Sequence, residues 1–298
     1  MVRQYKIHTN LDGTDDKVWD VTNGKVRFYQ PSNLGLQSTN NIWQSNGIGV
    51  MGTRSITQPQ IEFKLETFGE TLEENYQLLK DFVNDILNKK FVTLEYQTEI
   101  FQVYADLALA DVTKTEGYGK NGTFSEKITF DIITKWYTYE NLTFDMIENG
   151  KVIAGKSKIY GGTAPGNYKY VKGTSYTYYG ETNIERLSRW DIKDEIFSFM
   201  GILYPKLPKT PAGVRFLDDN GNEYTAIVFK TEQLQNYILI NTDVNDEIYQ
   251  GWNGTTSLNL FPVMDFERYR TRIIEKGQME LINLSKAEFK IKRKADFV

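Results

Sequence analysis

Apolar residues recur at helical spacing in one segment of the first half of the chain. Between residues 71 and 89 they fall three and four positions apart, which predicts an amphipathic helix. Thr71 and Glu74 form a T-x-x-E capping box at its start. Lys89 and Lys90 stand at its end, where the helix macrodipole favours cations. We expect this helix to close one side of a sheet.

Elsewhere in this half, apolar and polar residues alternate with the period of a half-buried β-strand. The expected strands cover residues 60–68, 91–96, 101–109 and 124–139. Short strands within residues 1–29 are separated by Asp12-Gly13 and Asn23-Gly24, both of which are hairpin-type dipeptides. The order of the elements predicts an α+β domain over residues 1–138, built as a split barrel or mostly antiparallel sheet with one helix.

Short alternating segments with turn residues between them follow in the second half. They cover residues 214–217, 224–229, 237–241, 257–260, 268–274 and 287–291. Asn220-Gly221, between the first two, is the strongest hairpin dipeptide of the chain. Residues 192–203 fit either a strand or a short helix. The spacing predicts a β-sandwich over residues 139–298, so that the whole chain is mainly β.

Residues 150–193 differ in composition from the rest of the chain. Eight Lys and Arg against three acids give them a net charge of +5, which leaves −9 for the remainder of a chain with a total of −4. Six tyrosines are interleaved with glycines there, and aliphatic residues are few. Because Tyr and Arg are enriched at protein interfaces, we interpret residues 149–189 as an arm that docks a protein. An ordinary long loop and a groove for single-stranded nucleic acid are the alternatives.

Composition restricts the chemistry that the chain can perform. It has no Cys, and its single histidine, His8, cannot supply a His-rich zinc site. The total charge of −4 disfavours binding to DNA or to an anionic membrane. No stretch reaches the ~18 apolar residues of a membrane helix, and the start lacks the apolar core of a signal peptide. We expect no membrane export, no cofactor, and no catalytic or metal-binding residues.

Several short motifs imitate functional sites. Residues 47–52 and 117–122 match G-x-G-x-x-G, but neither opens a helix after a strand, so we interpret both as structural turns. The acidic residues 218–223 lack the register of a calcium loop and are interpreted as a hairpin turn. The acidic residues 243–247 are interpreted as a solvated loop. His8 lies in an alternating segment and is expected to be an ordinary strand residue.

The order and extent of these segments resemble the distal tail protein family of siphophages, in the form found in lactococcal baseplates. The resemblance rests on the start MVRQYKIHTN, the strand–helix unit IEFKLETFGETLEENYQLLKDFVNDILNKKFVTLEY and the stretch GKSKIYGGTAPGNYKYVKGTSYTYYGE. It implies a hexameric ring of N-terminal domains around a channel. It also implies an outer galectin-like sandwich over residues 139–298 with an arm-and-hand extension at about 149–189, and a structural role without enzymatic activity.

The same resemblance implies the partners. These are further copies of the chain, trimers of receptor-binding protein held by the arm, the tail-tip protein, the tail-tube or tail-completion protein, and the tape measure. Assembly would take place in the host cytoplasm, and the product would be part of the virion tail tip. The candidate anchors for the receptor-binding protein are Tyr160, Tyr168, Tyr170, Tyr176, Tyr178, Tyr179, Arg186 and Arg189. Some such baseplates respond to calcium, for which the sequence indicates no ligands.

Two other functions stay open from the residues themselves. A carbohydrate-binding sandwich could use exposed aromatic residues such as Trp190 or Trp252 to stack on sugars. The histidine of a galectin sugar site is absent from it, however, because His8 lies outside the sandwich. A carboxylate glycosidase rests only on the abundance of acids, 39 in all, whose separation in space decides such chemistry.

Overall fold

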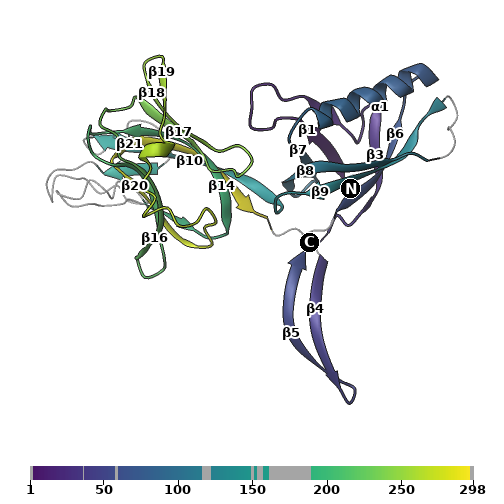
Figure 1. Ribbon diagram of the computed structural model, residues 1–298, viewed down its shortest axis with the longest axis horizontal. Helices are drawn as coiled ribbons and strands as arrows, with labels where there is room; N and C mark the ends of the chain where they lie inside the picture. The colour runs from purple at the N-terminus through teal and green to yellow at the C-terminus, as the bar shows by residue number, and fades with distance from the viewer. Residues whose placement is uncertain are drawn as a thin grey trace. The chain divides into compact units, whose positions relative to one another are not determined.

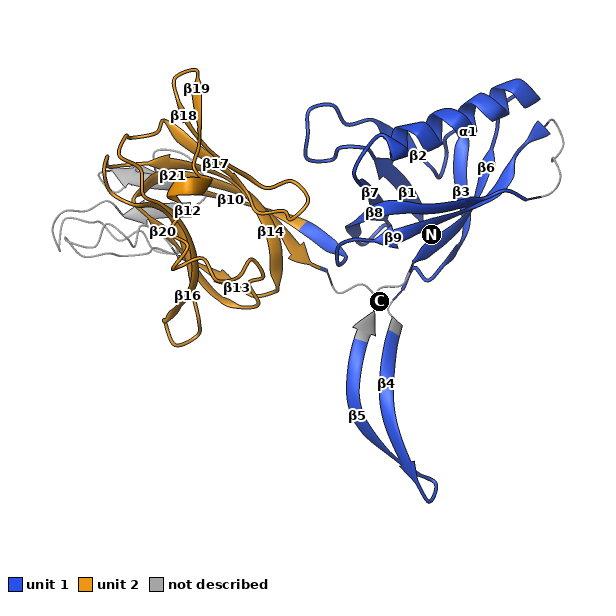
Figure 2. Cartoon of the chain, viewed as in Figure 1, with its two compact units in different colours: residues 1–138, 295–298 blue, residues 139–294 orange. Residues whose placement is uncertain are grey.

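The computed structural model describes residues 3–35, 37–57, 60–115, 122–148, 151–152, 157–160 and 189–295. The chain divides into two compact units, which Figure 2 colours separately. Unit 1 comprises residues 1–138 and 295–298, and unit 2 comprises residues 139–294. Each unit has its own hydrophobic core. Within the described ranges, no helix is long and apolar enough to cross a membrane.

Unit 1 is an antiparallel sheet with one helix (Figure 1). Its strands are β1 (Gln4–His8), β2 (Val18–Asp20), β3 (Val26–Ser32), β4 (Gln37–Ser45), β5 (Ile48–Thr57), β6 (Ile61–Thr67), β7 (Val92–Gln97), β8 (Gln102–Thr113) and β9 (Ser125–Ile132). They follow the order β2-β1-β7-β8-β9-β6-β3 in the sheet. β4 and β5 pair only with each other among the described strands.

The expected helix is confirmed as α1 (Leu72–Leu87). The hydroxyl of Thr71 accepts a hydrogen bond from the backbone N–H of Glu74 at 3.1 Å, which caps the first turn. Phe82 is fully buried and meets Trp19 and Phe28 edge to face at 5.2 and 5.8 Å between ring centroids. The apolar face of the helix is therefore fixed by aromatic contacts with the sheet.

One strand predicted for unit 1 is wrong in its extent. Residues 124–139 form two strands, because β9 ends at Ile132 and β10 (Tyr137–Glu148) begins five residues later. Between them the chain turns, and the backbone N–H of Ile133 donates to the carbonyl of Asp106 at 2.8 Å. Trp136 then returns to the core of unit 1. Apolar and polar residues continue to alternate through this turn, so the sequence pattern did not indicate that the strand is interrupted.

Unit 2 is formed by two sheets, which agrees with the prediction of a mainly β protein. Its further strands are β11 (Lys151–Val152), β12 (Ser157–Tyr160), β13 (Arg189–Ile192), β14 (Ile196–Pro205), β15 (Ala212–Leu217), β16 (Glu223–Phe229), β17 (Tyr237–Asn241), β18 (Ile248–Asn253), β19 (Thr256–Asn259), β20 (Gly277–Ile282) and β21 (Leu284–Lys294). One sheet has the order β19-β18-β17-β14-β21-β10, and the other β13-β20-β15-β16. Aromatic and aliphatic side chains from both fill the core of the unit.

Two predictions for unit 2 are resolved by these strands. The ambiguous residues 192–203 are strand, because β14 occupies most of them. The strand expected over residues 268–274 is wrong, since only Ile274 forms an isolated bridge, with Ile196. Thr225 binds this segment instead: its hydroxyl accepts from the backbone N–H groups of residues 270 and 271. These hydrogen bonds to a side chain hold the segment, which lacks the ladder of backbone hydrogen bonds of a strand.

Candidate interaction surfaces

The hairpin of β4 and β5 extends away from the sheet of unit 1 (Figure 2). Its two strands are joined by Asn46 and Gly47, whose φ angles are +50° and +79°. Positive φ at both central residues is typical of a type I′ turn, which favours Asn-Gly. The predicted turn at Gly47, Gly49 and Gly52 is confirmed only for Gly47, because Gly49 and Gly52 lie within β5. The two strands of the hairpin were not predicted. The Asn46-Gly47 dipeptide, which is typical of a hairpin turn, was the feature of the sequence that indicated this hairpin.

The hairpin exposes large apolar side chains along its length. Trp43 is 69% exposed and Ile48 is 71% exposed, and Ile42, Val50 and Met51 are also exposed. An isolated two-stranded hairpin is at best marginally stable in water, and exposed apolar patches of this kind mark interaction sites. This hairpin therefore has the character of an interaction surface.

Four further large side chains of unit 1 are exposed. They are Tyr29 on β3, Phe68 directly after β6, and Leu72 and Tyr76 on α1. The rings of Tyr29 and Phe68 lie 6.3 Å apart, and Leu72 and Tyr76 share one helix face because they are four residues apart. The guanidinium of Arg27 lies 4.5 Å from the Phe68 ring centroid, in the geometry of a cation–π contact.

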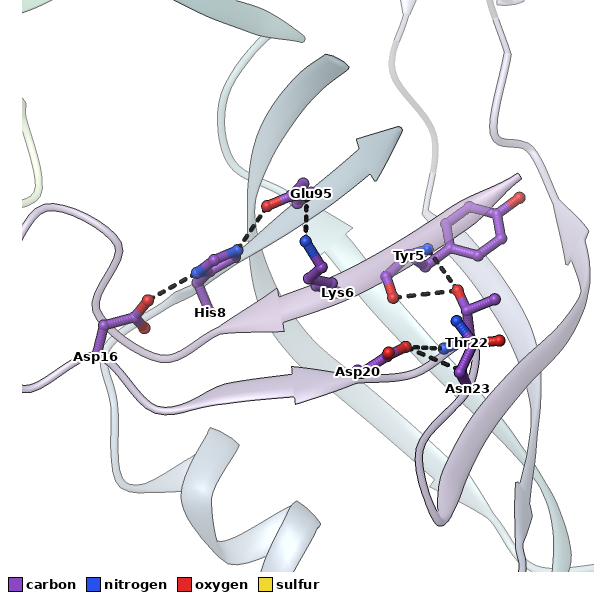
Figure 3. A network of polar contacts seen from close by, with 8 residues as sticks. All are labelled: Tyr5, Lys6, His8, Asp16, Asp20, Thr22, Asn23 and Glu95. Carbon is purple, nitrogen blue, oxygen red and sulfur yellow. Dashed lines mark hydrogen bonds and ion pairs between the residues drawn. The ribbon is translucent and has the colours of Figure 1, made fainter. Parts of the chain in front are cut away.

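His8 is part of a polar network between β1, β7 and the β1–β2 loop (Figure 3). Its Nδ1 lies 2.7 Å from Asp16 Oδ2, and its Nε2 lies 2.9 Å from Glu95 Oε2. Lys6 Nζ donates to the other oxygen of Glu95 at 2.9 Å. His8 is buried, and both its ring nitrogens face carboxylates that also bind other groups. It is a strand residue as predicted, with a role in fixing the β1–β2 loop.

The electrostatics of this network follow from its contacts. Burial by itself raises the pKa of Glu95, but hydrogen bonds and charges from Lys6 and His8 outweigh burial and hold the pKa below its ordinary value. On the neighbouring strand, burial and then the negative charge of Glu95 raise the pKa of Tyr104 to about 12. Glu95 is therefore ionised at neutral pH and Tyr104 is protonated. Neither Glu95 nor Tyr104 is therefore suited to exchange a proton near pH 7.

The predicted arm starts from one sheet of unit 2 and ends on the other. At its beginning, β11 and β12 both pair with β10. At its end, β13 pairs with β20 in the four-stranded sheet, where Arg189 stands opposite Glu280 in register. Glu280 is fully buried and its Oε2 accepts from Arg215 Nε at 2.9 Å. The return of the arm is thus attached to a strand that holds a buried ion pair.

The predicted arm anchors are placed only at these two ends. Tyr160 is the last residue of β12, in register with Ile147 of β10. Arg189 begins β13. The other six lie outside the described residues: Tyr168, Tyr170, Tyr176, Tyr178, Tyr179 and Arg186. The role predicted for the eight residues stays a prediction.

The acidic segments behave differently from each other. Residues 218–223 form the expected hairpin turn, in which Asp218 accepts hydrogen bonds from the backbone N–H groups of Asn220 and Asn222. Asp243 contradicts the prediction of a solvated loop, because it is buried and its Oδ2 lies 2.9 Å from Lys292 Nζ. Across the described ranges, no group of three or more His, Asp or Glu side chains could hold a metal ion.

Two domain models of one family together match nearly the whole chain. The model of the distal tail protein N-terminal domain matches residues 4–133, and that of the Dit C-terminal domain matches residues 135–298. The chain belongs to the distal tail protein family. This confirms the resemblance drawn from the sequence and makes the chain a structural component of the phage tail baseplate.

Individual distal tail proteins support the assignment. The chain is 94% identical to those of Lactococcus phage p2 and Lactococcus phage SK1, over the whole of both chains in each case. It matches a chain of the phage P2 baseplate, solved in its activated conformation with Ca, with a TM-score of 0.79, 94% identity and full coverage of both chains. The SPP1 Dit protein, at 9% identity, covers 99% of this chain with a TM-score of 0.52 and shows the same fold.

Proposed function

We propose that this chain is the hub of a phage tail baseplate, which joins the tail tube to the tail tip. Copies of it form a hexameric ring through residues 1–138, and each copy holds a trimer of receptor-binding protein through the arm at residues 149–189. The observation that carries this proposal is the match to both distal tail protein domains, over residues 4–133 and 135–298. The protein acts by binding, without catalysis.

The strand order of unit 1 supports self-association. Among the described strands, β2 pairs only with β1, and β3 pairs only with β6. Edge strands present unpaired backbone groups that can bind another chain. A head-to-tail contact between identical copies closes into a ring when the rotation between them divides a full turn. Unit 1 therefore offers the surfaces that a cyclic hub needs.

The arm has a composition and an attachment suited to holding a partner. Its tyrosines and arginines are of the types that dominate binding energy at interfaces. Its two ends pair with strands of different sheets, so a force on the arm is passed to both layers of unit 2. We propose that Tyr160, Tyr168, Tyr170, Tyr176, Tyr178, Tyr179, Arg186 and Arg189 supply the anchors.

Light scattering behind size exclusion tests the hub directly. The purified full chain should give a mass of about six subunits, as the proposed closed cyclic assembly requires. Tail-tube, tail-tip and receptor-binding proteins should each add their own mass to this ring when they are mixed with it. A chain without residues 149–189 should still form the ring but should fail to retain the receptor-binding protein. Retention of that protein by the shortened chain would refute the role of the arm. A monomeric mass in every mixture would refute the ring.

Carbohydrate binding by unit 2 is a second candidate, favoured by one group of rings. Tyr237 and Trp252 stand opposite each other on β17 and β18, with ring centroids 6.0 Å apart and planes 16° apart. Trp190 is unsuitable, since it packs against the core. A glycan array with host wall saccharides should show saturable binding that Trp252→Ala abolishes and Trp19→Phe leaves intact. An array without binding would exclude this function.

A further inference from the structure

The single histidine of the chain is buried at the end of β1, where the β1–β2 loop leaves the sheet (Figure 3). We propose that His8 is a pH-sensitive switch. Its doubly protonated ring holds the β1–β2 loop, residues 9–17, against the rest of unit 1, and the loop opens when the ring loses a proton. The switch operates within one copy of unit 1 and does not depend on the proposed ring.

Both ring nitrogens of His8 lie at hydrogen-bond distance from carboxylate oxygens. Nδ1 is 2.7 Å from Asp16 Oδ2, and Nε2 is 2.9 Å from Glu95 Oε2. An ionised carboxylate only accepts hydrogen bonds, and a neutral imidazole has a single N–H, so both hydrogen bonds form only when the ring carries two protons. A neutral ring would turn the lone pair of one nitrogen toward a carboxylate oxygen. Because His8 is 7% exposed, little water reaches this contact to screen the repulsion.

The two carboxylates differ in how firmly the fold holds them. Glu95 is buried in β7, a strand paired on both sides, and its Oε1 accepts a hydrogen bond from Lys6 Nζ at 2.9 Å. Asp16 belongs to the loop, where its Oδ1 accepts from the backbone N–H of Asn10 at 2.9 Å. A neutral ring therefore keeps its N–H on Glu95 and releases Asp16, because the loop can move and the strand cannot.

Ion pairs that join the loop to α1 and to the residues after it are more exposed than the contact with His8. Lys89 Nζ lies 3.0 Å from Asp15 Oδ2, and these side chains are 33% and 67% exposed. Lys17 pairs with Asp85 on α1, and the lysine is more than half exposed. Exposed pairs of this kind contribute little to stability, whereas loss of a hydrogen bond to a charged group shifts an equilibrium roughly tenfold or more. The contact between His8 and Asp16 therefore decides whether the loop stays closed.

Charged and titratable groups surround His8 on four strands and the loop. They are Lys6 on β1, Asp20 on β2, Asp16 in the loop, Glu95 on β7, and Tyr104 and Asp106 on β8. Carboxylic acids ordinarily titrate near pH ~4 and lysines near pH ~10. The pKa of Glu95 is lowered further, and that of Tyr104 is raised to about 12. Histidine is the side chain whose ordinary titration lies between these limits, so the loop is closed at the lower pH and opens as the pH rises.

Hydrogen–deuterium exchange of the full chain, read by mass spectrometry over a series of pH values, tests the switch. Exchange at the C2 carbon of the imidazole follows the charge of His8 alone, because the chain has no other histidine. Exchange of the backbone N–H of Asn10 follows the loop, because Asp16 accepts its hydrogen bond. After correction for the intrinsic effect of pH, we expect roughly tenfold faster exchange at Asn10 once His8 has lost its proton. Exchange at Asn10 that does not change across the titration of His8 overturns the proposal.

The variant Asp16→Asn should reverse the direction of the pH dependence. Its side-chain oxygen keeps the hydrogen bond from Asn10, so its NH₂ group faces Nδ1 of His8, where it donates to a neutral ring and opposes a protonated one. Exchange at Asn10 should therefore slow as the pH rises.

Asp15→Asn is the matched control for this reversal. It removes the partner of Lys89 from the same loop without touching His8, and it should keep the wild-type direction. Circular dichroism and the unfolding temperature establish that each variant is folded. A folded Asp16→Asn chain with the wild-type pH dependence would show that packing, and not the charge of His8, holds the loop. If that variant does not fold, the wild-type exchange profile still decides between the two.

Discussion

The buried ion pair between Lys292 on β21 and Asp243 in the β17–β18 connection permits a quantitative test of the energetics of unit 2. Lys292 Nζ lies 2.9 Å from Asp243 Oδ2, and the two side chains are 5% and 8% exposed. Asp243 Oδ1 also accepts a hydrogen bond from the backbone N–H of Asn245 at 2.9 Å. Removing the carboxylate takes away the counter-charge that lies 2.9 Å from a buried ammonium, and breaking a buried ion pair costs about 3–5 kcal/mol.

We expect Asp243→Ala to lower the free energy of unfolding of unit 2 by about 3–5 kcal/mol. For a domain of this size the unfolding temperature should fall by roughly 10 °C. The double variant Asp243→Leu with Lys292→Met should regain most of this loss, because it removes the cost of burying both charges. Scanning calorimetry of the full chain measures both effects, with the transition of unit 1 as the internal reference.

The result that would refute this reasoning is equally specific. A loss below about 1 kcal/mol for Asp243→Ala is the value of a solvent-exposed ion pair. It would mean that water reaches Lys292 in solution. A double variant as unstable as Asp243→Ala alone would mean that shape, and not charge, dominates at this position.

Three further outcomes are expected from the structure. The pKa of Glu95 is lowered from 4.5 on folding, so its contribution to stability is complete above pH 4.5 and is lost as the pH falls through the lower folded pKa. Glu95→Gln should therefore flatten the acid limb of a plot of unfolding free energy against pH. An unchanged acid limb would contradict this. Gly277→Ala should destabilise the four-stranded sheet by several kcal/mol, because φ at Gly277 is +120° and a Cβ there would lie 2.0 Å from the carbonyl oxygen of Leu217. Soluble expression and calorimetry measure the loss of stability. A variant as stable as the wild-type chain would contradict the close approach. Thr71→Ala should lower the free energy of unfolding by about 1 kcal/mol, because it removes the hydroxyl that caps the backbone N–H of Glu74. Urea unfolding measures this loss against Thr71→Ser, which keeps the hydroxyl. Equal losses in the two variants would contradict a capping role.

The interaction surfaces were only partly accessible from sequence. The arm was predicted from composition, since a basic, tyrosine-rich stretch with few aliphatic residues can be identified without knowledge of its neighbours, and its role stays a prediction. The hairpin was not, because its apolar residues, such as Trp43 and Ile48, alternate no differently from those of a strand with one buried face. Only the structure shows that both faces of β4 and β5 are exposed. Exposure of a strand depends on which other segments pack against it, and none of the described residues outside β4 and β5 buries these side chains.

The sequence by itself determined the elements whose physics is local. α1 follows from helical spacing and the Thr71 cap, and the turn at Asn220-Gly221 follows from the positive φ, +82°, that Gly221 adopts without strain. The tertiary structure decided what depends on distant partners. Residues 268–274 are held by hydrogen bonds to the hydroxyl of Thr225 and do not form a strand. Asp243 is buried because the fold places it against Lys292, 49 positions along the chain. Local preferences are encoded in neighbouring residues, whereas burial and pairing are decided by contacts that form only when the whole sheet is assembled.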